Sequence, residues 1–179
     1  DNHSWYELLQ KAGHSVTGQA EFQDATLPPV TAYVAQIAEV SVDTDTGEVR
    51  LLRLSTAHDV GKIVNPIGHQ GQINGGAMQG IGYALMEELT VEDGRVTTLT
   101  FGDYKIPTIK DIPELRTVLV ESENGVGPYN VKSIGENATI PVAAAIANAV
   151  EDAVGVRIKD LPITAEKVYR ALQAKKQQS

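Results

Sequence analysis

One carboxylate stands in a local setting where acid–base chemistry is possible. Glu136 lies in the segment KSIGEN (132–137), directly after a glycine and shortly before a stretch that predicts a helix capped at Thr139. A carboxylate held in a loop can accept a proton as a general base. It can equally be an ordinary carboxylate at a helix N-terminus, where the helix dipole favours negative charge. Spacing alone favours this second interpretation and leaves the first open.

Two glutamines share a glycine-rich segment. Gln72 and Gln79 lie seven residues apart in GQINGGAMQGIG (71–82), so a helix would place both on one face, two turns apart. Their carboxamides could donate to and accept from a polar, planar ligand, although two solvated surface side chains are the simpler interpretation. The segment is not a dinucleotide fingerprint, because no strand immediately precedes it and the glycine spacing differs.

Five glycines interrupt this helical pattern, and each costs about 1 kcal/mol relative to alanine in a helix interior. So many glycines indicate that something approaches the helix backbone closely. Tight packing against a neighbouring element explains them as well as a ligand does, and the pattern does not separate the two. The five are Gly71, Gly75, Gly76, Gly80 and Gly82.

Little in the sequence indicates another kind of catalytic, metal-binding or nucleic-acid-binding site. None of the four histidines has the H-E-x-x-H spacing, and no set of side-chain metal ligands is predicted. No cysteine is available for a disulfide or an iron–sulfur cluster, and no G-x-S-x-G motif is present. Asp59 and Asp103 are interpreted as loop or cap residues rather than catalysts. The net charge of −8 disfavours nucleic acid as a partner, and no apolar run is long enough to cross a membrane.

Local patterns predict the elements that position these residues. Ser4 and Glu7 form a capping box for a short helix that stops at Gly13, and weak alternation over 15–22 indicates a strand. The later predictions are a hairpin of 31–42 with 48–54 around a turn at 43–47, a helix over 68–89, a hairpin turn at 92–95, a strand over 116–121, a helix capped at Thr139 that ends at Val154, and a helix from Thr164 to Ala174 followed by a polar tail, 175–179.

The order of these elements favours the α+β class, because strands and helices follow one another without a regular β-α-β rhythm. We expect β-hairpins and short strands packed with one long glycine-rich helix and two C-terminal helices. A single domain over residues 1–179 is predicted, in which 1–30 has the weakest pattern.

Seven segments carry a further pattern. They are AEVSVDTDTGEV (38–49), AHDVGKIVNP (57–66), GQINGGAMQGIGYALMEEL (71–89), DYKIPT (103–108), KSIGE (132–136), AAIANAVEDAVG (144–155) and LPIT (161–164). In this order and spacing they resemble the C-terminal part of the molybdenum-binding subunit of the xanthine dehydrogenase and aldehyde oxidase family. The resemblance covers about residues 31–170.

The resemblance implies roles for particular residues. Glu136 corresponds to the family's glutamate beside molybdenum, which acts as a general base, and partial burial would tune its pKa toward the working pH. Gln72 corresponds to a glutamine whose amide reaches molybdopterin, and Gln79 belongs to the same motif. Three residues of the loop that presents the glutamate are also assigned to the cofactor site: Lys132, Ser133 and Gly135.

The resemblance also implies a reaction and its cofactors. The family hydroxylates aldehydes or N-heterocycles, or oxidises carbon monoxide, with oxygen taken from water. Its molybdenum is held by a pterin dithiolene, so the lack of cysteine in this chain is no obstacle. Analogy with the family favours the cytosine dinucleotide form of molybdopterin. Two 2Fe–2S clusters and FAD are expected on partner domains or subunits, together with the remaining domains of the molybdenum subunit.

Two departures from the family limit what the chain is expected to do alone. It is several times shorter than the family's molybdenum subunits, and its loop reads KSIGE where KGVGE is commoner. We therefore expect a fragment, a cloned domain or one subunit of a split enzyme, inactive by itself. The alternative is a non-catalytic assembly or interaction module that keeps the fold. The first residues show no secretory leader pattern, and a cytoplasmic location is expected.

Overall fold

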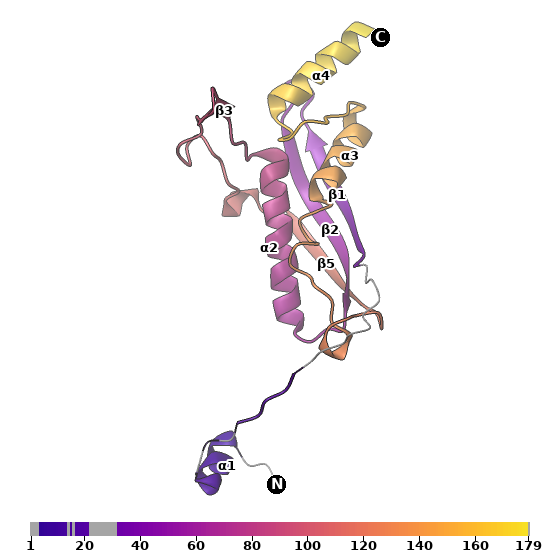
Figure 1. The fold of residues 1–179 in the computed structure, drawn as a ribbon. Helices are drawn as coiled ribbons and strands as arrows, with labels where there is room; N and C mark the ends of the chain where they lie inside the picture. Colours follow the sequence, from indigo (N-terminus) through magenta and orange to yellow (C-terminus); the bar gives the residue numbers. More distant parts are fainter. Residues whose placement is uncertain (1–3, 14, 16, 22–31, 179) are drawn as a thin grey trace.

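A three-stranded sheet with two helices on one face forms the body of the computed structural model (Figure 1). The structure describes residues 4–13, 15, 17–21 and 32–178. The sheet order is β1 (Val34–Val42), β2 (Val49–Gly61) and β5 (Glu114–Glu121). The helices against it are α2 (Pro66–Leu85) and α3 (Val142–Val154).

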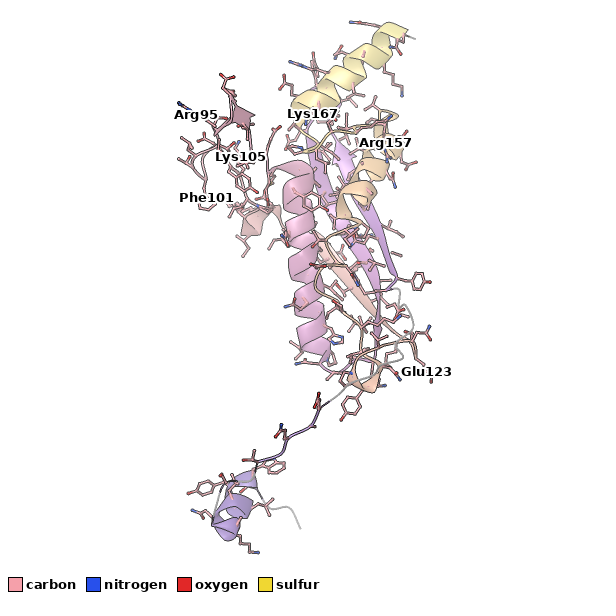
Figure 2. The ribbon with its side chains drawn as sticks, in the orientation of Figure 1. Arg95, Phe101, Lys105, Glu123, Arg157 and Lys167 are labelled. Carbon is pink, nitrogen blue, oxygen red and sulfur yellow. The ribbon has the colours of Figure 1, made fainter. Side chains whose placement is uncertain are left out.

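The remaining elements are shorter or lie at the edges of this body. They are α1 (Trp5–Ala12), β3 (Val91–Glu92), β4 (Arg95–Val96), η1 (Ile109–Asp111), η2 (Pro128–Asn130) and α4 (Ala165–Gln178). Figure 2 shows Arg95, Phe101 and Lys105 on a segment between α2 and η1 that stands away from the sheet. Among the described helices, none combines the length and hydrophobicity needed to cross a bilayer.

The α+β class is confirmed, and so are several local predictions. The Ser4–Glu7 capping box forms, with the Glu7 amide donating to Ser4 Oγ at 3.3 Å. β1 and β2 are the predicted hairpin, and their turn closes where the Asp43 carboxylate accepts from the Asp45 amide at 2.8 Å. The hairpin of β3 and β4 turns through two residues with positive φ, as a two-residue loop requires. The α3 helix ends at Gly155 in the left-handed region.

Several boundaries were predicted wrongly. α2 begins at Pro66 because Asn65 caps it, accepting from the Gly68 amide at 2.9 Å, and it ends at Leu85 instead of 89. β2 runs seven residues beyond the predicted end at 54, to Gly61. α4 continues through the predicted polar tail to Gln178. No strand is present among residues 15 and 17–21, and position 22 lies outside the described residues.

One topological feature departs from the predicted rhythm. β2 and β5 pair in parallel, and the chain between them includes α2, which makes a β-α-β connection. Parallel neighbours require such a crossover. The sequence pattern concealed it, because the long segment between α2 and β5 carries the second hairpin. The parallel pairing places the C-terminal ends of β2 and β5 side by side.

The core lies between the sheet and the helices. Its fully buried side chains include Leu54 of β2, Ile81 of α2 and Ile146 of α3. The outward face of the sheet stays open, and Ile37 of β1 is 73% exposed on it. Contact with the helices on a single face accounts for the strict alternation of half-buried and exposed residues along β1.

Candidate functional site

A groove of about 630 Å³ separates α2 from the turn that precedes α3. The predicted glutamate and both predicted glutamines line this groove, although α2 and the turn are far apart in the sequence. The residues that line it are Gly71, Gln72, Gly75, Gly76, Gln79, Gly135, Glu136, Thr139 and Ile140. Of the six residues assigned to the site from the sequence, four therefore meet here. The other two, Lys132 and Ser133, do not line the groove.

Gln72 and Gln79 lie on one face of α2, as their spacing predicts. Both are exposed along the groove. Gln72 also faces the opposite wall, since its Oε1 lies 3.9 Å from the position that a Cβ on Gly135 would take. The two carboxamides offer donors and acceptors along one wall, and Glu136 offers acceptors on the other.

The glycines of α2 fall into two groups, which match the two explanations considered for them: close packing of a neighbouring element, and space for a ligand. A Cβ on Gly76 would lie 2.7 Å from Ala138 Cβ, and a Cβ on Gly80 would lie 2.5 Å from Val142 Cγ2. These glycines allow the chain leading into α3 to pack against α2. A Cβ on Gly71 or Gly75 would instead meet open space, and both residues line the groove. Their bare backbone leaves room for a ligand to approach the helix.

Glu136 lies in a turn rather than at a helix start. The Thr139 amide donates to the Glu136 carbonyl at 3.0 Å, and α3 begins only at Val142. The explanation of Glu136 as an ordinary helix-entry carboxylate therefore loses its structural basis. The partial burial expected for it is also absent, because Glu136 is exposed on the groove in this chain.

Thr139 does not cap α3, in contrast to the prediction. Pro141 occupies the N-cap position. Thr139 is instead bound to α2 through both its side-chain hydroxyl and its backbone carbonyl. Its hydroxyl donates to the Gly76 carbonyl at 3.1 Å, and its own carbonyl accepts from Tyr83 Oη at 2.8 Å. Tertiary hydrogen bonds have replaced the local cap, and they fix the wall containing Glu136 against the wall containing the glutamines.

The strands beneath the groove add further anchors. Gln36 of β1 donates from Nε2 to the Ala138 carbonyl at 2.9 Å. Two buried side chains of β2 lie on the core side of the sheet, where Thr56 Oγ1 and His58 Nε2 are 2.6 Å apart. Burial lowers the pKa of His58, because desolvation disfavours the charged ring.

Lys132 forms a buried ion pair that sequence reasoning missed. Its Nζ lies 2.6 Å from Asp59 Oδ2, and the two side chains are 2% and 12% exposed. Burial raises the pKa of the Asp59 carboxyl, but hydrogen bonds from Lys132, Ser122 and the Gly61 amide, with the Lys132 charge, outweigh it and hold that pKa below its ordinary value. Asp59 was interpreted as a loop or cap residue, which is wrong because it lies within strand β2. Only the alternating apolar pattern before it could have indicated its burial.

No group of acidic or histidine side chains among the described residues could hold a metal ion directly.

Comparison with known proteins gives the context for a groove of this composition. Residues 1–113 match the profile of the family described as "Molybdopterin cofactor-binding domain". The chain belongs to this family. The matched residues include Gln72 and Gln79 and end before the loop of Glu136, so the roles of the residues in that loop stay predictions.

Individual relatives of this chain agree with the family. It is 38% identical over 159 residues to the xanthine dehydrogenase molybdenum-binding subunit of Escherichia coli O157:H7, which covers 88% of this chain and 21% of that subunit. The structure of quinoline 2-oxidoreductase from Pseudomonas putida 86 matches with a TM-score of 0.71 at 38% identity, over 75% of this chain and 18% of that one.

A second solved structure gives the same picture. Aldehyde oxidoreductase from Desulfovibrio gigas matches with a TM-score of 0.72 at 37% identity, over 79% of this chain and 15% of that one. The chain thus spans about a fifth of the length of the curated relatives it matches. The expected resemblance to the C-terminal part of molybdenum hydroxylases is confirmed, in fold as well as in sequence.

Proposed function

We propose that this chain forms one wall of the molybdenum-cofactor site in a molybdenum hydroxylase. Such an enzyme would hydroxylate an aldehyde or an N-heterocycle, or oxidise carbon monoxide, with oxygen from water. The observation that carries the proposal is the groove, where Glu136 faces Gln72 and Gln79 beside the bare backbone of Gly71 and Gly75. Membership of the molybdopterin-binding family supports the same assignment.

The residues of the groove fit a pterin cofactor. Pterins are flat and carry several hydrogen-bonding atoms, which carboxamides can match as donors and acceptors. Gln72 and Gln79 provide such groups, and side chains at Gly71 or Gly75 would fill the space beside them. The bound cofactor would take up the electrons that leave the substrate. We favour its cytosine dinucleotide form by analogy with the family.

Glu136 would act as the general base. Its carboxylate lies exposed on the groove, where it can accept a proton from an oxygen nucleophile that derives from water. General-base catalysis contributes about 10²–10⁴-fold to a rate. The remaining part of the molybdenum subunit would close the site and supply the exclusion of water that this open groove lacks.

Partners follow from the size of the chain. Because the chain spans about a fifth of its relatives' length, most of the cofactor contacts and the substrate pocket would lie outside it. We place two 2Fe–2S clusters and FAD on partner domains or subunits, which would carry electrons away from the site. A small organic substrate and a cytoplasmic location complete the proposal.

Substitution of the glutamate tests this function. Glu136→Gln keeps the size of the side chain but cannot accept the proton, so reduction of the complete enzyme by substrate should slow by at least about 10²-fold. Rapid-reaction kinetics measure this rate, and molybdenum content is determined on the same sample. Glu123→Gln is the matched control, because Glu123 is exposed on the loop after β5 (Figure 2) and does not line the groove.

The alternative of a non-catalytic module predicts a different result. If a cofactor-replete Glu136→Gln enzyme is reduced by substrate within a few-fold of the wild-type rate, the general-base assignment is wrong. Cofactor content that falls with Glu136→Gln would instead assign the residue to binding.

A further inference from the structure

The buried ion pair of Asp59 and Lys132 lies at a crossing of three chain segments. Lys132 Nζ donates to Asp59 Oδ2 at 2.6 Å, while Asp59 Oδ1 accepts from Ser122 Oγ at 2.7 Å and from the Gly61 amide at 3.1 Å. Both oxygens of the carboxylate are therefore engaged. The pair joins the end of β2, the residue after β5 and the start of the loop that carries Glu136.

Backbone hydrogen bonds at the same place fix the register of these segments. The Lys132 amide donates to the Val60 carbonyl at 3.1 Å, and the Lys62 amide donates to the Asn130 carbonyl at 3.0 Å. Gly61 has a φ of +66°, and a Cβ there would collide with the Asn130 carbonyl. The loop therefore leaves the sheet from a defined point and in a defined direction.

The far end of the same loop is anchored separately. Ala138 accepts from Gln36 of β1, and Thr139 is bound to Gly76 of α2. Within the loop, Asn137 Nδ2 donates to the Ser133 carbonyl at 3.0 Å. Glu136 thus lies on a short span held at both ends, with Lys132 four residues before it.

Stability alone does not explain a buried ion pair at this position. Replacing such a pair with apolar side chains of similar volume is often neutral or stabilising, because two charges must be removed from water. What the pair adds is direction, since a charge-assisted hydrogen bond constrains both partners in distance and angle. Lys132 does not line the groove, and its ammonium group binds Asp59 instead.

We propose that Asp59 and Lys132 are a positioning pair, which places Glu136 at the groove without touching the cofactor. This inference rests on the proposed function of Glu136 and goes beyond it, since it assigns Asp59 a role and moves Lys132 from the cofactor to the support of the loop. A displacement of about 1 Å at a reacting group can lower a rate by about 10²-fold. A loop that holds Glu136 less firmly should therefore lower kcat.

Two variants of the full-length subunit in the complete enzyme test the pair. Asp59→Asn removes the charge and keeps an oxygen acceptor, whereas the double variant Asp59→Leu with Lys132→Met replaces the pair with apolar side chains. We expect kcat to fall about 10–100-fold in the double variant and less in Asp59→Asn. KM should stay within about threefold and molybdenum content should be unchanged, because neither residue touches substrate or cofactor.

A structural readout accompanies the kinetics. Amide hydrogen exchange over residues 133–137 should become faster in both variants, with and without cofactor, because local exchange reports loss of tethering. Lys62→Met is the matched control. Lys62 forms an ion pair with Glu121 at 2.9 Å beside the same strand ends, but the two side chains are 57% and 44% exposed. This control should leave kcat and loop exchange unchanged.

Several results would overturn the positioning role. A cofactor-replete double variant with kcat within twofold of wild type would do so. Loss of molybdenum in a third variant, Lys132→Met alone, but not in Asp59→Asn, would also do so, because it would return Lys132 to the cofactor. If the double variant fails to fold, Ser122→Ala removes one hydrogen bond to Asp59 and should still lower kcat at least about threefold. Glu136→Gln measured in parallel separates the two proposals, because a normal rate there rejects the general base itself.

Discussion

At the scale of single residues, the site depends on which side chains are absent as much as on which are present. Gly75 and Gly76 are neighbours on α2, yet a Cβ on Gly75 would enter the open groove and a Cβ on Gly76 would press on Ala138. Adjacent glycines thus have different surroundings: Gly76 permits close packing, and Gly75 leaves open space that the proposed function assigns to the cofactor. The sequence showed the excess of glycine, but the neighbours of each glycine depend on the tertiary fold.

Alanine substitutions at these two positions should therefore have opposite effects. Gly75→Ala should stabilise the chain by about 0.5–1 kcal/mol, because alanine restricts the unfolded state and favours the helix. Gly76→Ala should destabilise it by about 1–3 kcal/mol through overpacking against Ala138. Chemical denaturation of both variants measures the difference. Shifts of the same sign and size at the two positions would contradict the division of the glycines.

The Gly75 variant also bears on the cofactor. In the complete enzyme, Gly75→Ala should lower molybdenum content even though the chain is more stable, because the added methyl group occupies the groove. Stability and cofactor occupancy would then change in opposite directions. Full occupancy in Gly75→Ala would show that nothing approaches the backbone at this position.

At the scale of elements, β2 connects the core with the site. Its buried His58 lies two residues after Thr56 and one before Asp59 of the positioning pair. Burial lowers the pKa of His58 below the ordinary histidine value of 6.5. Well above pH 6.5 the ring is neutral in both folded and unfolded chains. As the pH falls below 6.5, the unfolded chain takes up a proton that the folded chain resists, and the free energy of unfolding decreases.

This linkage gives a measurable pH dependence. Between pH 6.5 and the lowered folded pKa, His58 should reduce the free energy of unfolding by up to about 1.4 kcal/mol per pH unit. His58→Gln should remove that part of the slope, since glutamine does not titrate. Denaturant titrations at pH 5.5 and 7.5, on wild type and variant, provide the comparison. Equal slopes in the two proteins would show that His58 charges freely in the folded state.

The helices and strands also show which structural features local sequence patterns can predict and which they cannot. The capping box at Ser4, the turn at 43–47 and the stop at Gly155 were predictable, because each depends on neighbours in the sequence. The extension of β2 and its parallel partner β5 were not, since they depend on burial between distant segments. Thr139 fails as a cap for the same reason, because α2 binds its hydroxyl.

The site followed the same division. Helical periodicity predicted the common face of Gln72 and Gln79. Family resemblance singled out Glu136, which lines the same groove, and its role as a base stays a prediction. The ion pair of Asp59 with Lys132 joins residues 73 positions apart, and neither spacing nor composition indicated it. Periodicity orders the residues of one helix, whereas contacts across the fold have no periodic signature.

At the scale of the whole molecule, the proposed function makes the groove one side of a larger site. Binding sites for ligands of this size bury about 70–90% of the ligand surface, which a single open wall cannot do. The 179-residue chain purified alone should therefore hold far less than one molybdenum atom per chain. Metal analysis of the purified chain checks this expectation. Stoichiometric molybdenum would show that the groove binds the cofactor without the remaining subunit.

The structure of the full-length subunit with its cofactor tests the central claim most directly. We expect the pterin to lie in the groove between α2 and the turn of Glu136, with the Gln72 carboxamide within hydrogen-bond distance of it and the Lys132 side chain still paired with Asp59. A cofactor bound elsewhere, with this groove filled by other parts of the subunit, would contradict the account.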